Sequence, residues 1–135
     1  MISTMSTKQW FHVASTDLMA ARHLSADTMY PKLLDISCFH CQQAAEKALK
    51  GFLQFKEQDP PHIHNIRTLC DLCMELDTSF ESILDTAVPL NRYITASRYP
   101  TESLITETMT QAAIMQAQTV YDFALSKVPW LQPTA

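Results

Sequence analysis

Arg98, Tyr99 and Pro100 are the residues in this sequence best suited to hold an anion. Pro100 disfavours the helical region for Tyr99, so a helix is expected to end near Arg98. An arginine at a helix C-terminus is favourable for the helix dipole, and its planar set of N–H donors also suits a phosphate or carboxylate. The sequence leaves both roles open for Arg98.

A second set of polar residues lies earlier in the chain. His40 and Lys47 share a polar stripe of one helix, and His64 stands just before the next helix. Asp17 lies on an apolar stripe, so its carboxylate needs a partner elsewhere in the fold. Glu46, with Gln43 one turn before it, fits an ordinary helix surface as well as a functional site.

The four cysteines have the ligand count of a structural zinc site. They form the pairs Cys38-x-x-Cys41 and Cys70-x-x-Cys73, a spacing found in zinc proteins. Both pairs, however, lie on the apolar stripes of amphipathic segments, where cysteine is a good small core residue. We therefore predict four reduced core cysteines and no bound metal.

The elements that must position these residues are predicted to be helices. Apolar residues recur at three- and four-residue steps, and the chain has one glycine in 135 residues, too few for the turns of most sheet folds. On the first helix the predicted apolar face contains Trp10, Val13, Ala14, Ala21 and Leu24. The fold class is all-α, an up-and-down bundle of about five helices in a single domain, 1–135, with helices over 7–26, 33–55, 66–76, 79–98 and 103–128.

Composition excludes several classes of function. The formal net charge of −4 argues against a general grip on nucleic-acid backbone. The glycine count excludes a P-loop or a dinucleotide fingerprint. No apolar run reaches the ~20 residues that span a bilayer, and the N-terminal residues lack a signal-peptide pattern. We expect a cytoplasmic protein without membrane contact and without a cofactor.

Taken together, these features resemble the HEPN family. The strongest stretch runs from Phe39 to Lys50, and further matches are His64-Asn65-Ile66, Arg98-Tyr99-Pro100 and the first-helix residues Ala14, Asp17, Leu18 and Ala21. The resemblance implies a helical bundle, usually a homodimer, that often works beside a minimal nucleotidyltransferase in a toxin–antitoxin or nucleotide-handling pair.

Many members of this family are metal-independent ribonucleases with an arginine followed by a histidine four to six residues later. Here the four arginines are Arg22, Arg67, Arg92 and Arg98, and none has a histidine at that spacing. The sequence therefore leans towards a domain that is not an enzyme.

Three hypotheses follow. In the first, the domain binds a nucleotide or nucleotide-like anion through His40, Lys47, His64 and Arg98, Tyr99 stacks on a base, and Asp17, Gln43 and Glu46 orient the cluster. In the second, it is a ribonuclease in which Arg98 works with His64 or His40. In the third, the polar cluster only fixes the register of the helices in a structural partner domain.

The apolar residues also predict a homodimer. Phe39, Leu49, Leu53 and Phe55 together exceed what one small core is expected to bury. A contiguous apolar patch on such a domain usually marks an interface.

Overall fold

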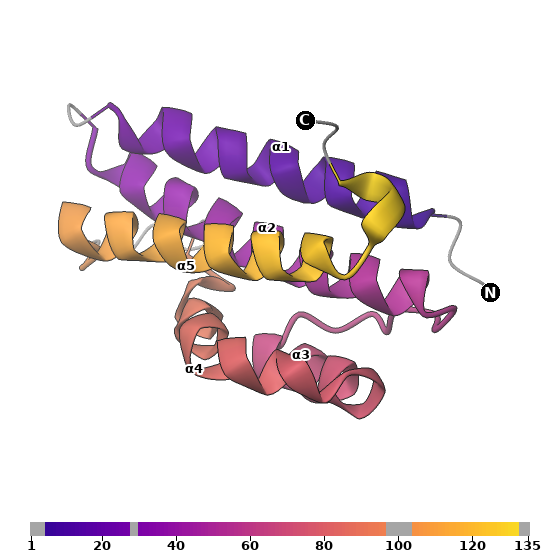
Figure 1. Cartoon of the computed structure of the whole chain (residues 1–135). Coiled ribbons are helices and arrows are strands. Elements are labelled where there is room, and N and C mark those ends of the chain that lie inside the picture. Colours follow the sequence, from indigo (N-terminus) through magenta and orange to yellow (C-terminus); the bar gives the residue numbers. More distant parts are fainter. Residues whose placement is uncertain (1–4, 28–29, 97–103, 133–135) are drawn as a thin grey trace.

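The computed structural model describes residues 5–27, 30–96 and 104–132, and all regular structure in these ranges is helical (Figure 1). Three long helices lie side by side, and the shorter helices labelled α3 and α4 pack below them in this view. The elements are α1 (Thr7–Ser25), α2 (Lys32–Phe55), α3 (Ile66–Leu76), η1 (Thr78–Ile83), α4 (Leu84–Ala87), η2 (Val88–Tyr93), α5 (Glu107–Ser126) and η3 (Pro129–Leu131), where η is a 3₁₀ helix. The all-α class with five α-helices is confirmed.

Helix α1 begins with a capping box. The Ser6 hydroxyl accepts from the Gln9 amide, and the Gln9 side chain accepts from the Ser6 amide. Its core residues are Phe11, Ala14, Leu18 and Ala21. The predicted apolar face of α1 was therefore wrong in part: Trp10, Val13 and Leu24 are half-buried, while Phe11 and Leu18 occupy the centre.

Helix α2 is the central element and packs against α1, α3, α5 and η2. Its seam of small residues lets the neighbouring helices approach closely. At Gly51 an added Cβ would lie 2.8 Å from the Phe11 ring, so α1 approaches α2 closely at this residue. Leu49 and Leu53 also face the core, at 0% and 2% exposure, which corrects the expectation that these two are surplus to it.

The four cysteines lie in the core, each with 0% exposure. Burial raises the pKa of the Cys41 and Cys70 thiols to about 12, and it also raises the pKa values of Cys38 and Cys73. A thiol held in this way is a weak nucleophile and a weak metal ligand, because both roles need the thiolate.

The expected fourth helix is wrong in its described part. In place of one helix from Ser79, the chain forms two 3₁₀ turns around the four-residue helix α4. A break lies near Pro89, because α4 ends at Ala87 and Pro89 lies in the first turn of η2. Proline has no amide proton to donate and excludes a continuous helix there.

Helix α5 also begins later than expected. Leu104 to Thr106 are not helical, and the Thr106 hydroxyl caps the helix by accepting from the Met109 amide. No described helix has the length and apolar character needed to cross a membrane.

Candidate functional site

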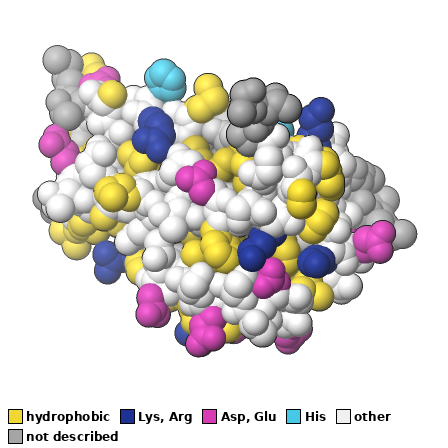
Figure 2. Space-filling model, viewed as in Figure 1, with side chains coloured by type: hydrophobic (Ala, Val, Ile, Leu, Met, Phe, Trp, Pro, Cys, Tyr) yellow, Lys and Arg dark blue, Asp and Glu magenta, His cyan; other side chains and the backbone are white. Residues whose placement is uncertain are grey.

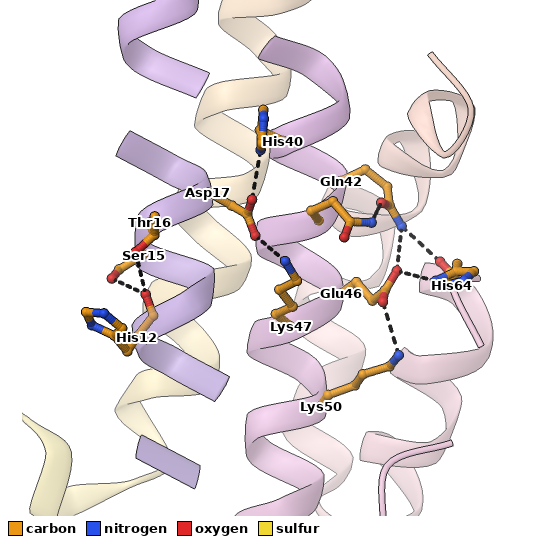
Figure 3. Close-up of polar contacts among 11 residues, drawn as sticks. His12, Ser15, Thr16, Asp17, His40, Gln42, Glu46, Lys47, Lys50 and His64 are labelled. Carbon is orange, nitrogen blue, oxygen red and sulfur yellow. Dashed lines mark hydrogen bonds and ion pairs between the residues drawn. The ribbon is translucent and has the colours of Figure 1, made fainter. Parts of the chain in front are cut away.

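Asp17 joins α1 to α2 through two cationic partners (Figure 3). One carboxylate oxygen lies 2.8 Å from His40 Nδ1, and the other accepts from Lys47 Nζ at 2.8 Å. The Asp17 side chain is only 10% exposed, whereas His40 and Lys47 are 29% and 22% exposed. The carboxylate therefore lies beneath its partners and fixes them at the edge of solvent. We call these three residues the Asp17 cluster.

Glu46, which lies on α2 itself, has a similar arrangement. Its Oε1 lies 3.0 Å from His64 Nδ1 and its Oε2 accepts from Lys50 Nζ at 3.0 Å. His64 comes from the segment before α3 and is 57% exposed, while Lys50 is 7% exposed. The Trp10 ring lies 5.8 Å from the lysine nitrogen and covers it. We call these residues, with Gln42, the Glu46 cluster.

Gln42 ties the Glu46 cluster to the segment before α3. Its Nε2 donates to Glu46 Oε1 at 3.2 Å and to the His64 carbonyl at 3.0 Å, and its Oε1 accepts from Gln43 Nε2. Gln42 is fully buried, and a buried amide with every group bonded orients its neighbours rigidly.

The sequence did not single out Gln42 or Lys50 as part of a site. Gln42, Glu46 and Lys50 follow one another at four-residue steps, which places their side chains on one face of a helix. That spacing was the signal that could have found them. The structure buries Lys50 at 5% exposure, which is unusual for a lysine.

Of the predicted site residues, the structure brings Asp17 of α1 to His40 and Lys47 of α2, and it brings His64 to Glu46. Gln43 donates to Gln42, the glutamine of the Glu46 cluster. Arg98 and Tyr99 lie outside the described residues. The predicted partner for Asp17 is found on α2, as an imidazole and an ammonium group.

The chemistry of the two clusters depends on which imidazole nitrogen is engaged. In both histidines Nδ1 faces a carboxylate, and Nε2 has no hydrogen bond within the described residues. A carboxylate that accepts from Nδ1–H leaves Nε2 as a proton acceptor, or as a donor once the ring is charged. Each cluster can therefore exchange a proton or hold an anion at Nε2.

A metal site does not arise from these groups in the described part of the chain. Nowhere in residues 5–27, 30–96 and 104–132 do three or more His, Cys, Asp or Glu side chains gather closely enough to hold an ion. Charged side chains of both signs are interspersed on the face in Figure 2, so that face offers no broad basic surface.

Comparisons with known proteins agree with the fold. The HEPN domain family model matches residues 7–128 of this chain. Among solved structures, the crystal structure of ST0689, an archaeal HEPN homologue, superposes with a TM-score of 0.72 at 30% identity, over 93% of this chain and 99% of that one. A search of curated proteins gives no significant match.

Proposed function

The chain belongs to the HEPN family, and we propose that it is a binding domain that takes a nucleotide or nucleotide-like anion at the solvent-exposed side chains of the Asp17 and Glu46 clusters. The Asp17 and Glu46 clusters supply the donors His40, Lys47 and His64. Arg98 and Tyr99 join the proposal from the sequence alone.

The observation that carries this proposal is the repeated placement of a buried carboxylate beneath an exposed imidazole. Asp17 and Glu46 are 10% and 5% exposed at the side chain, and each bonds Nδ1 of a histidine that reaches solvent. A held imidazole loses little conformational entropy when it meets a ligand, and charge-assisted hydrogen bonds to phosphate are strong. Packing alone does not require either ring to reach solvent.

Charge balance within the clusters leaves room for an anion. Each cluster holds one carboxylate and one lysine, so its net charge is zero while the imidazole is neutral. A phosphate bound at Nε2 adds negative charge to a cluster that has no excess of its own, and hydrogen bonds to phosphate are charge-assisted.

A ribonuclease is the second candidate, and the same carboxylate–imidazole pairs support it. An imidazole Nε2 would take the proton of a 2′-hydroxyl, whose oxygen then attacks the adjacent phosphorus. The bond from phosphorus to the 5′-oxygen breaks, and that oxygen receives a proton. Arg98 would stabilise the charge on the phosphorane. The absence of the family's Arg-x4–6-His spacing places this candidate second.

Partners follow as part of the proposal. A homodimer and a minimal nucleotidyltransferase partner, as in a toxin–antitoxin-like pair in the cytoplasm, are what the family resemblance implies. The apolar argument for the dimer is weaker than the sequence suggested, because only Phe39 and Phe55 of the four residues are left half-buried.

Calorimetry with ATP and AMP tests the proposal directly. We expect binding by the wild type that is lost in Lys47→Met and in Arg98→Ala and reduced in His64→Ala. Arg67→Ala is the matched control, because Arg67 is exposed and pairs with Asp71 of its own helix, α3. Binding that is absent in the wild type, or equal in Lys47→Met and the control, would contradict the proposal. RNA cleavage that disappears in His64→Ala would favour the second candidate.

A further inference from the structure

A groove between α1 and α5 lies on the other side of α1 from the Asp17 cluster. Its volume is about 450 Å³, which lies within the range of small-molecule sites. Phe11, Leu125 and Leu131 line it with apolar surface, and the Tyr121 ring meets the Phe11 ring edge to face at 6.0 Å. Figure 3 shows His12 and Ser15 turned away from Asp17 on α1.

Ser15, the serine that lines the groove, is already hydrogen-bonded within α1. Its hydroxyl donates to the His12 carbonyl at 2.8 Å, so an apolar body lying against it would strand no donor there. The wall of the groove beside it is apolar and is formed by Phe11, Leu125 and Leu131.

The rim of the groove carries two basic side chains. Lys8 and His12 are exposed and line its α1 side, and within the described residues neither side chain has a polar partner. None of the described residues that line the groove is acidic. The nearest acid in sequence, Asp122, already accepts from the Gln118 amide at 2.8 Å. The first turn of α1 also carries the positive end of the helix dipole, close to Lys8.

We propose that this groove binds a small amphipathic anion, with a carboxylate-type head at Lys8 and His12 and a ring-sized apolar body over Phe11 and Leu125. The shape and charge select against two simpler ligands. An inorganic anion would leave the apolar floor exposed to water, and a neutral apolar molecule would leave the Lys8 ammonium without a partner. The site is separate from the nucleotide site proposed above and stands if that proposal fails.

A pair of probes with the same ring tests the proposal. Indole-3-acetate carries the anion, and indole-3-ethanol replaces it with a neutral hydroxyl. In amide chemical-shift titrations of the full chain we expect saturable shifts at Ser15, Tyr121 and Leu131 with indole-3-acetate, and about fivefold weaker binding with the alcohol, the size of one exposed ion pair. Inorganic phosphate alone should not saturate these shifts.

Charge-reversal variants identify the rim. Lys8→Glu should weaken indole-3-acetate binding about fivefold or more, and the fold should hold, because an acid in the first turn of a helix is favourable. Arg67→Glu makes the same change in net charge on α3 and should leave the affinity unaltered. If Lys8→Glu unfolds, His12→Glu serves in its place. Three results would overturn the proposal. They are equal affinity for both indoles, equal effects of Lys8→Glu and Arg67→Glu on the affinity, and chemical-shift changes at Asp17 and Glu46 in place of Ser15 and Tyr121.

Discussion

The Asp17 and Glu46 clusters each join a carboxylate to a histidine and a lysine, but in different structural settings. Asp17 reaches from α1 to two partners on α2, and both partners keep a fifth or more of their side chain in solvent. Glu46 bonds Lys50 on its own helix, and that lysine is 7% exposed beneath Trp10. One cluster therefore joins two helices at the surface, and the other holds a charged pair inside the fold.

This difference separates stability from binding. A buried cation that loses its carboxylate has no water to replace it, so the Glu46–Lys50 pair is costly to break. The Lys47 ammonium and the His40 ring are partly exposed and can turn to solvent. Breaking their contacts with Asp17 therefore costs less free energy, and a ligand can more easily take the place of the Asp17 carboxylate. We expect Glu46 to be chiefly structural and the Asp17 cluster to be chiefly functional.

Glu46→Gln should give the largest loss of stability, about 3 kcal/mol. The change leaves the Lys50 ammonium without its counter-charge at 5% exposure. Urea unfolding followed by circular dichroism measures the difference. The double variant Glu46→Leu with Lys50→Leu is the control, because it removes both charges and should recover much of the loss. A Glu46→Gln protein as stable as the wild type would refute the structural role.

Asp17→Asn should cost less, about 1–2 kcal/mol. His40 and Lys47 lose a charged acceptor but remain within reach of water. The same urea experiment measures this loss. A cost equal to that of Glu46→Gln would show that exposure of the cation does not decide the energy, and the comparison would fail.

Thiol labelling can locate where each variant opens. In the wild type we expect slow labelling at pH 8, since burial raises the pKa of all four thiols, to about 12 for Cys41 and Cys70. Glu46→Gln loosens the segment before α3 and should expose Cys70 first. Asp17→Asn loosens α1 and should expose Cys41, which lies near Arg22 of α1. Mass spectrometry of the labelled peptides distinguishes the two patterns, and identical labelling in both would contradict separate openings.

The periodicity of apolar residues was sufficient to predict α2 and α3 and the burial of all four cysteines. In both segments apolar residues recur without interruption at three- and four-residue steps, so only one face of each helix can be buried. It misplaced the face of α1, where Trp10 is large and apolar yet lies over Lys50 in place of the core. It also missed the 3₁₀ turns from Thr78 to Tyr93. Those turns depend on tertiary contacts such as Asp77 with Lys127 at 3.3 Å, which no local pattern encodes.

Most residues of the two clusters were predicted from the sequence, but the pairing of each carboxylate with its histidine and lysine was not. The acidic residues and the histidines were identified, and the need of Asp17 for a partner followed from its place on an apolar stripe. The Glu46 cluster also depends on Gln42, a buried amide that donates to Glu46 and to the His64 carbonyl and that was not singled out from the sequence. The placement of Arg98 and Tyr99 stays a prediction.

The smallest effects should come from the histidines, and they sharpen the comparison further. His64→Ala should cost less than about 1 kcal/mol, because the ring is 57% exposed and Glu46 keeps its bonds to Lys50 and Gln42. His40→Ala should cost somewhat more, because its ring is less exposed and also meets Phe39 edge to face at 5.7 Å. Double-mutant cycles with Asp17→Asn and Glu46→Gln isolate each carboxylate–imidazole pair from the rest of its cluster. We expect the larger coupling for Asp17 with His40, although Glu46→Gln alone is the more damaging change. The opposite ranking would mean that His64, and not Lys50, is the partner that makes Glu46 indispensable.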